Sequence, residues 1–141
     1  MTPVMIRSFE HFDKNEIKTL YESVGWTSYL RYPDLLEKAY AHSLQTLAAY
    51  KDNQLIGIIR AVGDGVSILY IQDLLVSPEH QRKGLGSRLL NEMLQCFPDV
   101  NQVVLLTDDT EAMIHFYESA GFQLVQKAGC CSLIRLHPCY Q

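Results

Sequence analysis

The stretch SPEHQRKGLGSRLL, residues 77–90, changes character in its middle. A polar segment led by a proline gives way to Gly84 and Gly86, and leucines then recur at helical spacing. The first turn of a helix leaves backbone N–H groups unpaired, and the helix dipole adds partial positive charge there. Because glycine lets a ligand approach the backbone without a Cβ in the way, the stretch predicts a phosphate-binding loop between a strand and a helix.

The two glycines alone leave several interpretations open. A P-loop requires GxxxxGK[ST], which this stretch lacks, and a dinucleotide fingerprint requires a third glycine where Leu89 stands. An ordinary turn followed by a helix start is the simplest alternative. Further motifs are needed to choose among them.

Composition limits the class of ligand. The 141 residues are 48% hydrophobic and 20% charged, which suits one folded domain over residues 1–141. The formal net charge of −4 argues against a nucleic-acid or membrane partner, because binding to polyanions is mainly cationic. Arg82, Lys83 and Arg88 nevertheless cluster beside the glycines, and this local charge suits a small anionic ligand.

The N-terminus and the cysteines predict a cytoplasmic protein. Residues 1–12 contain no long apolar run, so we expect no signal peptide, and no segment approaches the ~18 apolar residues of a membrane helix. The cysteines form no CxxC pair, which favours free thiols in a reducing compartment. Adjacent cysteines on a strand point to opposite faces, so we expect no metal site in the set Cys130, Cys131, His137 and Cys139.

Hydrophobic periodicity predicts an α/β (α+β) chain with the order β, two helices, three strands, α, β, α, β, β. The expected elements are strand 4–9, helix 13–24, a helix from 33 or 34, three strands within 46–76, helix 85–97, strand 102–107, helix 108–121, and strands 122–125 and 131–136. Turns are expected at residues 52–53 and 63–65, where Asp-Asn and Gly-Asp-Gly stand.

Two motifs at the right separation then give a more specific indication. Leu74-Leu75-Val76 followed by Gln81, Gly84 and Gly86 matches [Q/R]xxGx[G/A] after a strand, and residues 116–122 read FYESAGF. In these motifs and in element order the chain resembles the GNAT superfamily of N-acetyltransferases, most strongly over residues 70–122. The resemblance implies the GNAT fold, a mixed and mostly antiparallel sheet of about seven strands with flanking helices, and acetyl-CoA as co-substrate.

The resemblance also implies where acetyl-CoA binds. The strand over residues 70–76 is expected to carry a bulge, its backbone at Leu74 and Val76 pairing with the pantetheine arm and a nearby N–H polarising the thioester carbonyl. Backbone N–H groups from Arg82 to Ser87 would hold the pyrophosphate, and the side chains of Arg82 and Lys83 either join them or are merely solvated. The full expected set is Leu74, Leu75, Val76, Gln81, Arg82, Lys83, Gly84, Leu85, Gly86 and Ser87.

Two residues are expected to carry the chemistry, a direct attack of an amine on acetyl-CoA in a ternary complex. Tyr117 matches the family's general acid, which protonates the leaving thiolate; the alternative is a ring that packs in the core. Asp73, an acid on an apolar strand, is the candidate base; the alternative is a structural carboxylate paired with a cation or the backbone.

The acceptor is the least determined part. In the family it meets the early helices and their loop, where Trp26, Tyr29 and Tyr32 could line a pocket for an amine or bury the helices on the sheet. The leading hypothesis is a primary amine of a small molecule. The alternatives are an acyl-CoA-binding sensor without turnover and a protein or peptide N-acetyltransferase. Dimers are common in the family, so a homodimer is one expected assembly.

Overall fold

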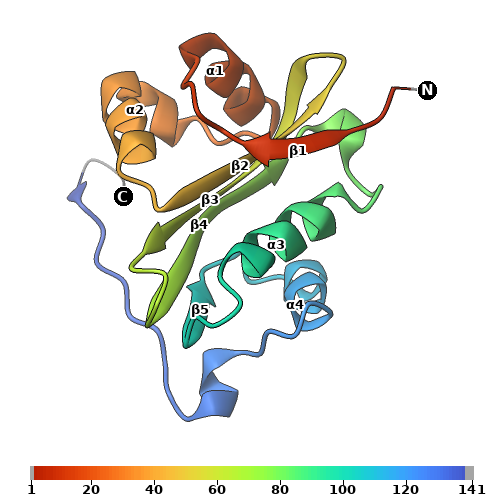
Figure 1. Ribbon diagram of the computed structural model, residues 1–141. Helices are drawn as coiled ribbons and strands as arrows, with labels where there is room; N and C mark the ends of the chain where they lie inside the picture. Colours follow the sequence, from red (N-terminus) through yellow and green to blue (C-terminus); the bar gives the residue numbers. More distant parts are fainter. Residues whose placement is uncertain (1, 139–141) are drawn as a thin grey trace. The chain divides into compact units, whose positions relative to one another are not determined.

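The computed structural model describes residues 2–138, and it divides into two compact units, Met1–Leu106 and Thr107–Gln141 (Figure 1). The first unit holds β1 (Met5–Ser8), α1 (Lys14–Ser23), η1 (Ser28–Arg31), α2 (Pro33–Ala41), β2 (Gln45–Lys51), β3 (Gln54–Gly63), β4 (Ile68–Val76), η2 (Pro78–His80), α3 (Leu85–Cys96) and β5 (Gln102–Leu105). The second holds α4 (Glu111–Glu118) and η3 (Val125–Ala128). Whether residues 1–141 act as one domain stays a prediction.

The five strands of the first unit form one sheet in the order β1-β2-β3-β4-β5. Neighbouring strands from β1 to β4 are antiparallel, and β5 runs parallel to β4. A parallel pair needs a crossover connection, and α3 supplies it. The expected fold class, a mixed and mostly antiparallel sheet with helices, is therefore confirmed.

Two of the expected strands are wrong, so the described residues form a sheet of five strands rather than about seven. The segment expected as strand 122–125 runs into the 3₁₀ turn η3, and the segment 131–136 has no strand partner in the described part of the chain. Leu133 is 94% exposed and Ile134 66% exposed. A pattern of β-formers makes a strand only where its backbone finds a ladder to join, and the sequence pattern carries no such information.

The sheet of the first unit is covered on both faces. In Figure 1, α1 and α2 lie on one face and α3 lies on the other. Successive side chains of a strand point to opposite faces, so Ile58 and Arg60 of β3 face α1 and α2, while Gly57 and Ile59 face α3. A Cβ on Gly57 would stand 3.2 Å from a methyl group of Leu89, so α3 packs close against the strand.

Local signals in the sequence account for the ends of several elements. Asp13 caps α1, because its carboxylate accepts the N–H groups of Asn15 and Glu16 at 2.9 and 3.1 Å. Asp52 and Asn53 take the left-handed conformation in the β2–β3 turn, which confirms that expected hairpin. In the next turn the carboxylate of Asp64 accepts the Ser67 hydroxyl at 2.6 Å and three backbone N–H groups, which together hold its pKa well below the ordinary value.

Candidate functional site

The loop between β4 and α3 presents bare backbone at the start of a helix. Gly84 precedes α3 with φ of 80°, and a Cβ added there would meet nothing within 4 Å. No described side chain caps this end of the twelve-residue helix. The first-turn N–H groups of Leu85, Gly86 and Ser87 therefore have no capping side chain. An open space beside unpaired, dipole-polarised N–H groups fits a phosphate group.

Arg82 adds to this arrangement through its backbone. Its φ is 62°, a left-handed conformation that is uncommon for a residue with a side chain. Left-handed residues in a loop turn successive N–H groups toward one concave surface, where they can bind an anion. The side chains of Arg82 and Lys83 are exposed. The loop thus combines left-handed backbone at Arg82 and Gly84 with two exposed cations.

Gln81 holds the loop to the strand that precedes it. Its side-chain amide donates to the carbonyl oxygen of Val76 at 2.8 Å. Ser77 and His80 are joined side chain to side chain at 2.7 Å across η2. The sequence singled out Gln81 for ligand binding, and its contact in the structure is with the chain itself. The Ser77–His80 pair was missed, although a serine three residues before a histidine around a proline is a recognisable local-turn signal.

The strand β4 carries the expected bulge. Arg60 of β3 lies opposite Asp73 of β4, and the next residue, Ala61, lies opposite Ile71. Gln72 is therefore an extra residue without an opposite partner on β3. A bulge bends its strand and redirects the side chains around it, which is why bulges recur beside binding sites.

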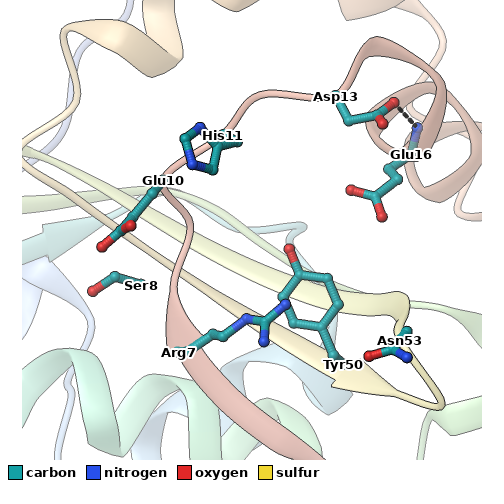
Figure 2. Close-up of a pocket in the computed structure, with 8 residues that line it drawn as sticks. All are labelled: Arg7, Ser8, Glu10, His11, Asp13, Glu16, Tyr50 and Asn53. Carbon is teal, nitrogen blue, oxygen red and sulfur yellow. Dashed lines mark hydrogen bonds between the residues drawn. The ribbon is translucent and has the colours of Figure 1, made fainter.

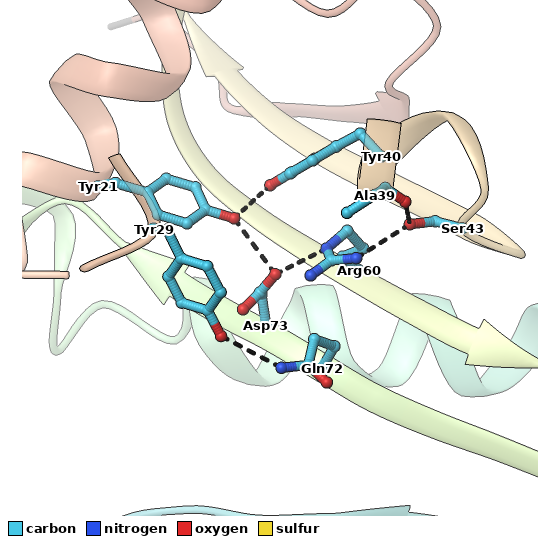
Figure 3. A network of polar contacts seen from close by, with 8 residues as sticks. All are labelled: Tyr21, Tyr29, Ala39, Tyr40, Ser43, Arg60, Gln72 and Asp73. Atoms are coloured by element: carbon cyan, nitrogen blue, oxygen red, sulfur yellow. Dashed lines mark hydrogen bonds and ion pairs between the residues drawn. The ribbon is translucent and has the colours of Figure 1, made fainter. Parts of the chain in front are cut away.

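Asp73 lies at the centre of a buried polar network beneath α1 and α2 (Figure 3). Its side chain is fully buried, and its Oδ2 accepts the Arg60 Nε–H at 2.7 Å and the Tyr21 hydroxyl at 3.2 Å. The Tyr21 hydroxyl also bonds the Tyr40 hydroxyl at 2.5 Å, and Arg60 donates to Ser43 at 3.2 Å. The other carboxylate oxygen, Oδ1, is buried without a hydrogen-bond partner among the described residues.

Burial and charge act in opposite directions on this network. Burial raises the pKa of Asp73, and the Arg60 guanidinium and the Tyr21 hydroxyl offset part of that rise. Burial likewise raises the pKa values of Tyr21 and Tyr40 well above the ordinary value, so both phenols stay protonated. The sequence identified Asp73 but missed Arg60, although both are charged residues within apolar strands of one predicted hairpin.

Two of the three expected acceptor residues pack together at the edge of this network. The rings of Trp26 and Tyr29 lie 6.3 Å apart, and each meets the ring of Tyr21 edge-on, at 6.0 and 5.7 Å. The Tyr29 hydroxyl accepts a hydrogen bond from the side chain of Gln72 at 3.2 Å. Tyr32, the third, precedes α2 and is 41% exposed.

Tyr117 belongs to the second unit, where an aromatic cluster fixes its ring. It lies on α4 with ring centroids 4.9 Å from Phe116 and 5.7 Å from Phe122. The N–H of Phe122 donates to the Tyr117 carbonyl oxygen at 3.1 Å, and Gly121 between them has φ of 95°. Tyr117 is buried, and burial raises its pKa. Packing therefore holds the ring and keeps the phenol protonated, as a proton donor requires.

A hollow of about 680 Å³ lies elsewhere on the first unit (Figure 2). It is lined by Arg7, Ser8, Glu10, His11, Asp13, Glu16, Tyr50 and Asn53, none of which is an expected site residue. The Arg7 guanidinium stacks over the Tyr50 ring at 4.2 Å, and the carboxylate of Asp13 caps α1. These contacts give the polar lining a structural role, and we assign no ligand to it.

No three described His, Cys, Asp or Glu side chains are grouped so that they could bind a metal ion. Cys96, Cys130 and Cys131 are free, and Cys139 lies outside the described residues. None of the described helices is both long and apolar enough to span a membrane.

Comparison with known proteins gives consistent matches. Residues 11–122 match the family model described as "Acetyltransferase (GNAT) family". The chain is 32% identical over 126 residues to an uncharacterized N-acetyltransferase ycf52-like of Prochlorococcus marinus, covering 85% of this chain and 68% of that protein. It is 27% identical to the histone acetyltransferase TAP1 of Glycine max, covering 79% of this chain but only 52% of that protein. The structure matches a GNAT family acetyltransferase of Streptococcus pneumoniae with a TM-score of 0.86 and 37% identity, covering 96% and 99% of the two chains.

Proposed function

We propose, from the premise that the chain belongs to the acetyltransferase (GNAT) family, that it transfers an acetyl group from acetyl-CoA to the primary amine of a small molecule. The observation that carries this proposal is the pairing of the bulged strand β4 with the open helix start at Gly84. One element offers redirected strand backbone to the pantetheine arm, and the other offers unpaired N–H groups to the pyrophosphate. The bulge and the helix start both lie in the first unit. Along the chain, nine residues, Gln72 to His80, separate Ile71 of β4 from Gln81 in the loop before α3.

The chemistry assigned to the chain follows from what each group can donate or accept. The nitrogen of a neutral amine attacks the carbonyl carbon of the acetyl thioester, a C–N bond forms and the C–S bond breaks. A backbone N–H at Leu75 or Val76 would stabilise the negative charge that develops on the carbonyl oxygen. Tyr117 would then donate its phenolic proton to the departing thiolate, and because burial raises the pKa of this phenol, it carries the proton before the reaction.

The proton released by the attacking amine needs an acceptor. We assign this role to Asp73, through its Oδ1, which is the carboxylate oxygen without a partner among the described residues. The ion pair with Arg60 lowers the basicity of the group, while burial raises it. An ordered water between the amine and Oδ1 would serve the same transfer, because Oδ1 itself is buried.

The side chains of Arg82 and Lys83 would attract the phosphate groups of acetyl-CoA by their charge without fixing the orientation of those groups. Both side chains are exposed, so water and salt screen their charges. Each contact with a phosphate group therefore adds little binding free energy. The amides between residues 82 and 87 carry the directional contacts. Replacing either cation should therefore affect acetyl-CoA affinity less than altering the backbone at Gly84.

We favour a small amine as the acceptor because the residues expected to bind the acceptor are few and aromatic. Trp26 and Tyr29 present two adjoining rings beside a buried carboxylate, a combination that suits an amine with an apolar body. The likeness to a soybean histone acetyltransferase favours a second candidate, a protein or peptide acceptor, with weaker support because this chain spans about half of that relative.

The deciding experiment incubates the protein with acetyl-CoA and a panel of polyamines, arylalkylamines, amino sugars, amino acids and peptides, read by mass spectrometry. We expect one class of small amine to gain an acetyl group, with kcat for Tyr117→Phe lower by about a hundredfold. Acetylation of peptides alone would replace the small-molecule proposal with the second candidate.

Calorimetric titration with acetyl-CoA is the necessary companion to that panel. Tyr117→Phe should bind acetyl-CoA as wild type does, because the phenol acts on the leaving group and not on the pyrophosphate. Equal binding by both proteins with no product from either would identify an acyl-CoA-binding sensor instead.

A further inference from the structure

The extra residue of the β4 bulge reaches across to the aromatic segment before α2. Gln72 is exposed, and its side-chain amide donates to the Tyr29 hydroxyl at 3.2 Å (Figure 3). Tyr29 lies in η1, a short 3₁₀ helix without a side-chain cap from the described residues. The extra residue of the β4 bulge thus holds a residue of a separate segment of the chain.

Backbone contacts do little to hold that segment in place. Over residues 24–32 the backbone hydrogen bonds run to nearby residues, as from the Trp26 N–H to Tyr21 at 3.0 Å and from the Leu30 N–H to Thr27 at 3.1 Å. Such local bonds shape a turn without fixing it to the sheet. The segment depends on side chains for that, among them Val24 and Leu30 packed against the core, the ring contacts of Trp26 and Tyr29 with Tyr21, and the hydrogen bond from Gln72.

The bulge end of this contact is rigid by comparison. Asp73, next to Gln72, is locked to Arg60 on the neighbouring strand at 2.7 Å in a fully buried pair. Tyr21, which packs on Tyr29, also donates to Asp73 at 3.2 Å. Three routes therefore join Tyr29 to the bulge: a direct one through Gln72, one through the ring of Tyr21, and one through the hydroxyl of Tyr29 itself, which interacts with the Asp73 carboxylate. Of these, only the route through Gln72 can be cut without disturbing the buried network.

We propose that the Gln72–Tyr29 hydrogen bond links the backbone of β4 to the segment 26–32, so that acetyl-CoA bound along β4 positions Trp26 and Tyr29 for the acceptor. This inference rests on the proposed function. Gln72 is here a positioning residue, which acts on the acceptor through Tyr29. Because coupling between two binding sites is reciprocal, acceptor bound at the segment raises the affinity for acetyl-CoA by the same factor.

Trp26 makes the link measurable without any turnover, because it is the single tryptophan of the chain and lies 6.3 Å from the Tyr29 ring. Its emission is recorded with and without saturating acetyl-CoA, and its accessibility is measured by acrylamide quenching of the free protein. The variants are Gln72→Ala, which removes the donor alone, and Tyr29→Phe, which removes the acceptor together with the hydroxyl that interacts with Asp73; both leave the rings. Gln54→Ala, which removes another exposed glutamine at the start of β3, is the matched control.

Acetyl-CoA should change the Trp26 emission of wild type and of Gln54→Ala, and this change should be lost in Gln72→Ala and in Tyr29→Phe. Quenching of Trp26 should increase in both linked variants even without a ligand. Once an acceptor is known, its KM should rise about fivefold in either variant with kcat retained, the factor expected for one hydrogen bond. The double variant should add nothing to the single ones.

Other results would distinguish failure of the Gln72–Tyr29 link from failure of the proposed function. A change in Trp26 emission that persists in both variants, or that is absent from wild type although calorimetry shows binding, overturns the link and leaves the acetyltransferase proposal intact. Absence of acetyl-CoA binding in wild type overturns the proposed function and with it the cofactor half of the link. Quenching that is identical in wild type and both variants overturns the contact between Gln72 and the segment itself.

Discussion

The two covered faces of the sheet in the first unit are built in opposite ways. On the face beneath α3 the buried residues are apolar, with Leu89, Leu90 and Met93 fully buried. On the face beneath α1 and α2 lie Arg60 and Asp73, and Thr46 shares that face by the alternation of β2. These three are the buried polar or charged residues of the described chain.

Stability explains the composition of one face better than that of the other. Burying a leucine stabilises a fold by about 1.5–3 kcal/mol, so the α3 face needs no other explanation than stability. A buried ion pair gains little or nothing over apolar side chains of similar volume. The polar network is therefore poorly explained by stability, and its place beside Tyr29 and the bulge of β4 points to a functional reason.

The largest expected effect is on the polar face. Arg60→Leu should lower the free energy of unfolding by about 4 kcal/mol, because it leaves Asp73 buried without its counter-charge. Urea denaturation followed by circular dichroism measures the loss. The double variant Arg60→Leu/Asp73→Leu should recover most of it. If the double variant were as unstable as the single one, the pair would be contributing stability after all, and the contrast between the faces would disappear.

On the apolar face the effect should be nearly as large but of a different kind. Leu89→Ala should lower the free energy of unfolding by about 3 kcal/mol, because it removes buried methyl groups and leaves a cavity. The emission of Trp26 in the folded variant should remain that of wild type. A shifted emission spectrum would show that the faces are not independent.

The apolar face should affect binding only through the end of the helix that covers it. Gly84→Ala should weaken acetyl-CoA binding about tenfold by calorimetry, since its Cβ would enter the open space at the helix start, and should lower stability by about 1 kcal/mol through its left-handed φ. Gly129→Ala is the control, because Gly129 has φ of 81° and equally open surroundings. Loss of affinity in both variants would attribute the effect to backbone strain in general.

The response to alkali should also distinguish the two faces. Burial raises the pKa values of Tyr21 and Tyr40 above those of the unfolded chain, so the folded state keeps these protons longer. The stability they contribute is fully present below about pH 10 and is lost as pH rises further, by at most ~1.4 kcal/mol per pH unit for each tyrosine. Urea denaturation at pH 9 and pH 11 measures it. Leu89→Ala should leave this pH dependence unchanged, whereas Tyr40→Phe should reduce it.

Much of the first unit could be predicted from the sequence because its signals are local. Asp13 before α1 and Gly84 before α3 each specify a helix start within a few residues. The partners of Asp73 and Tyr29 could not be predicted in this way. Arg60 is 13 residues from Asp73, and Gln72 is 43 residues from Tyr29, so these contacts depend on strand register and on where a bulge falls. One residue more or less in a strand moves every following side chain to the other face.

The two wrong strands have the same physical origin. Residues 131–136 alternate in a way that suits a strand, yet pairing is a property of two segments and not of one. The sequence did carry one overlooked signal. Arg60 and Asp73 are the charged residues in two apolar strands joined by a short turn, and charges of opposite sign across a hairpin are natural partners.

The left-handed backbone of Arg82 makes the stability of the loop and its capacity to bind an anion separate properties. A glycine or asparagine would adopt this conformation with less strain, so the loop is less stable with Arg82 than with either of those residues. The same loop offers its amide groups whatever side chain it carries. Substitution of Arg82 would therefore change the stability of the protein, and substitution of the neighbouring Lys83 would change the charge presented to an anion.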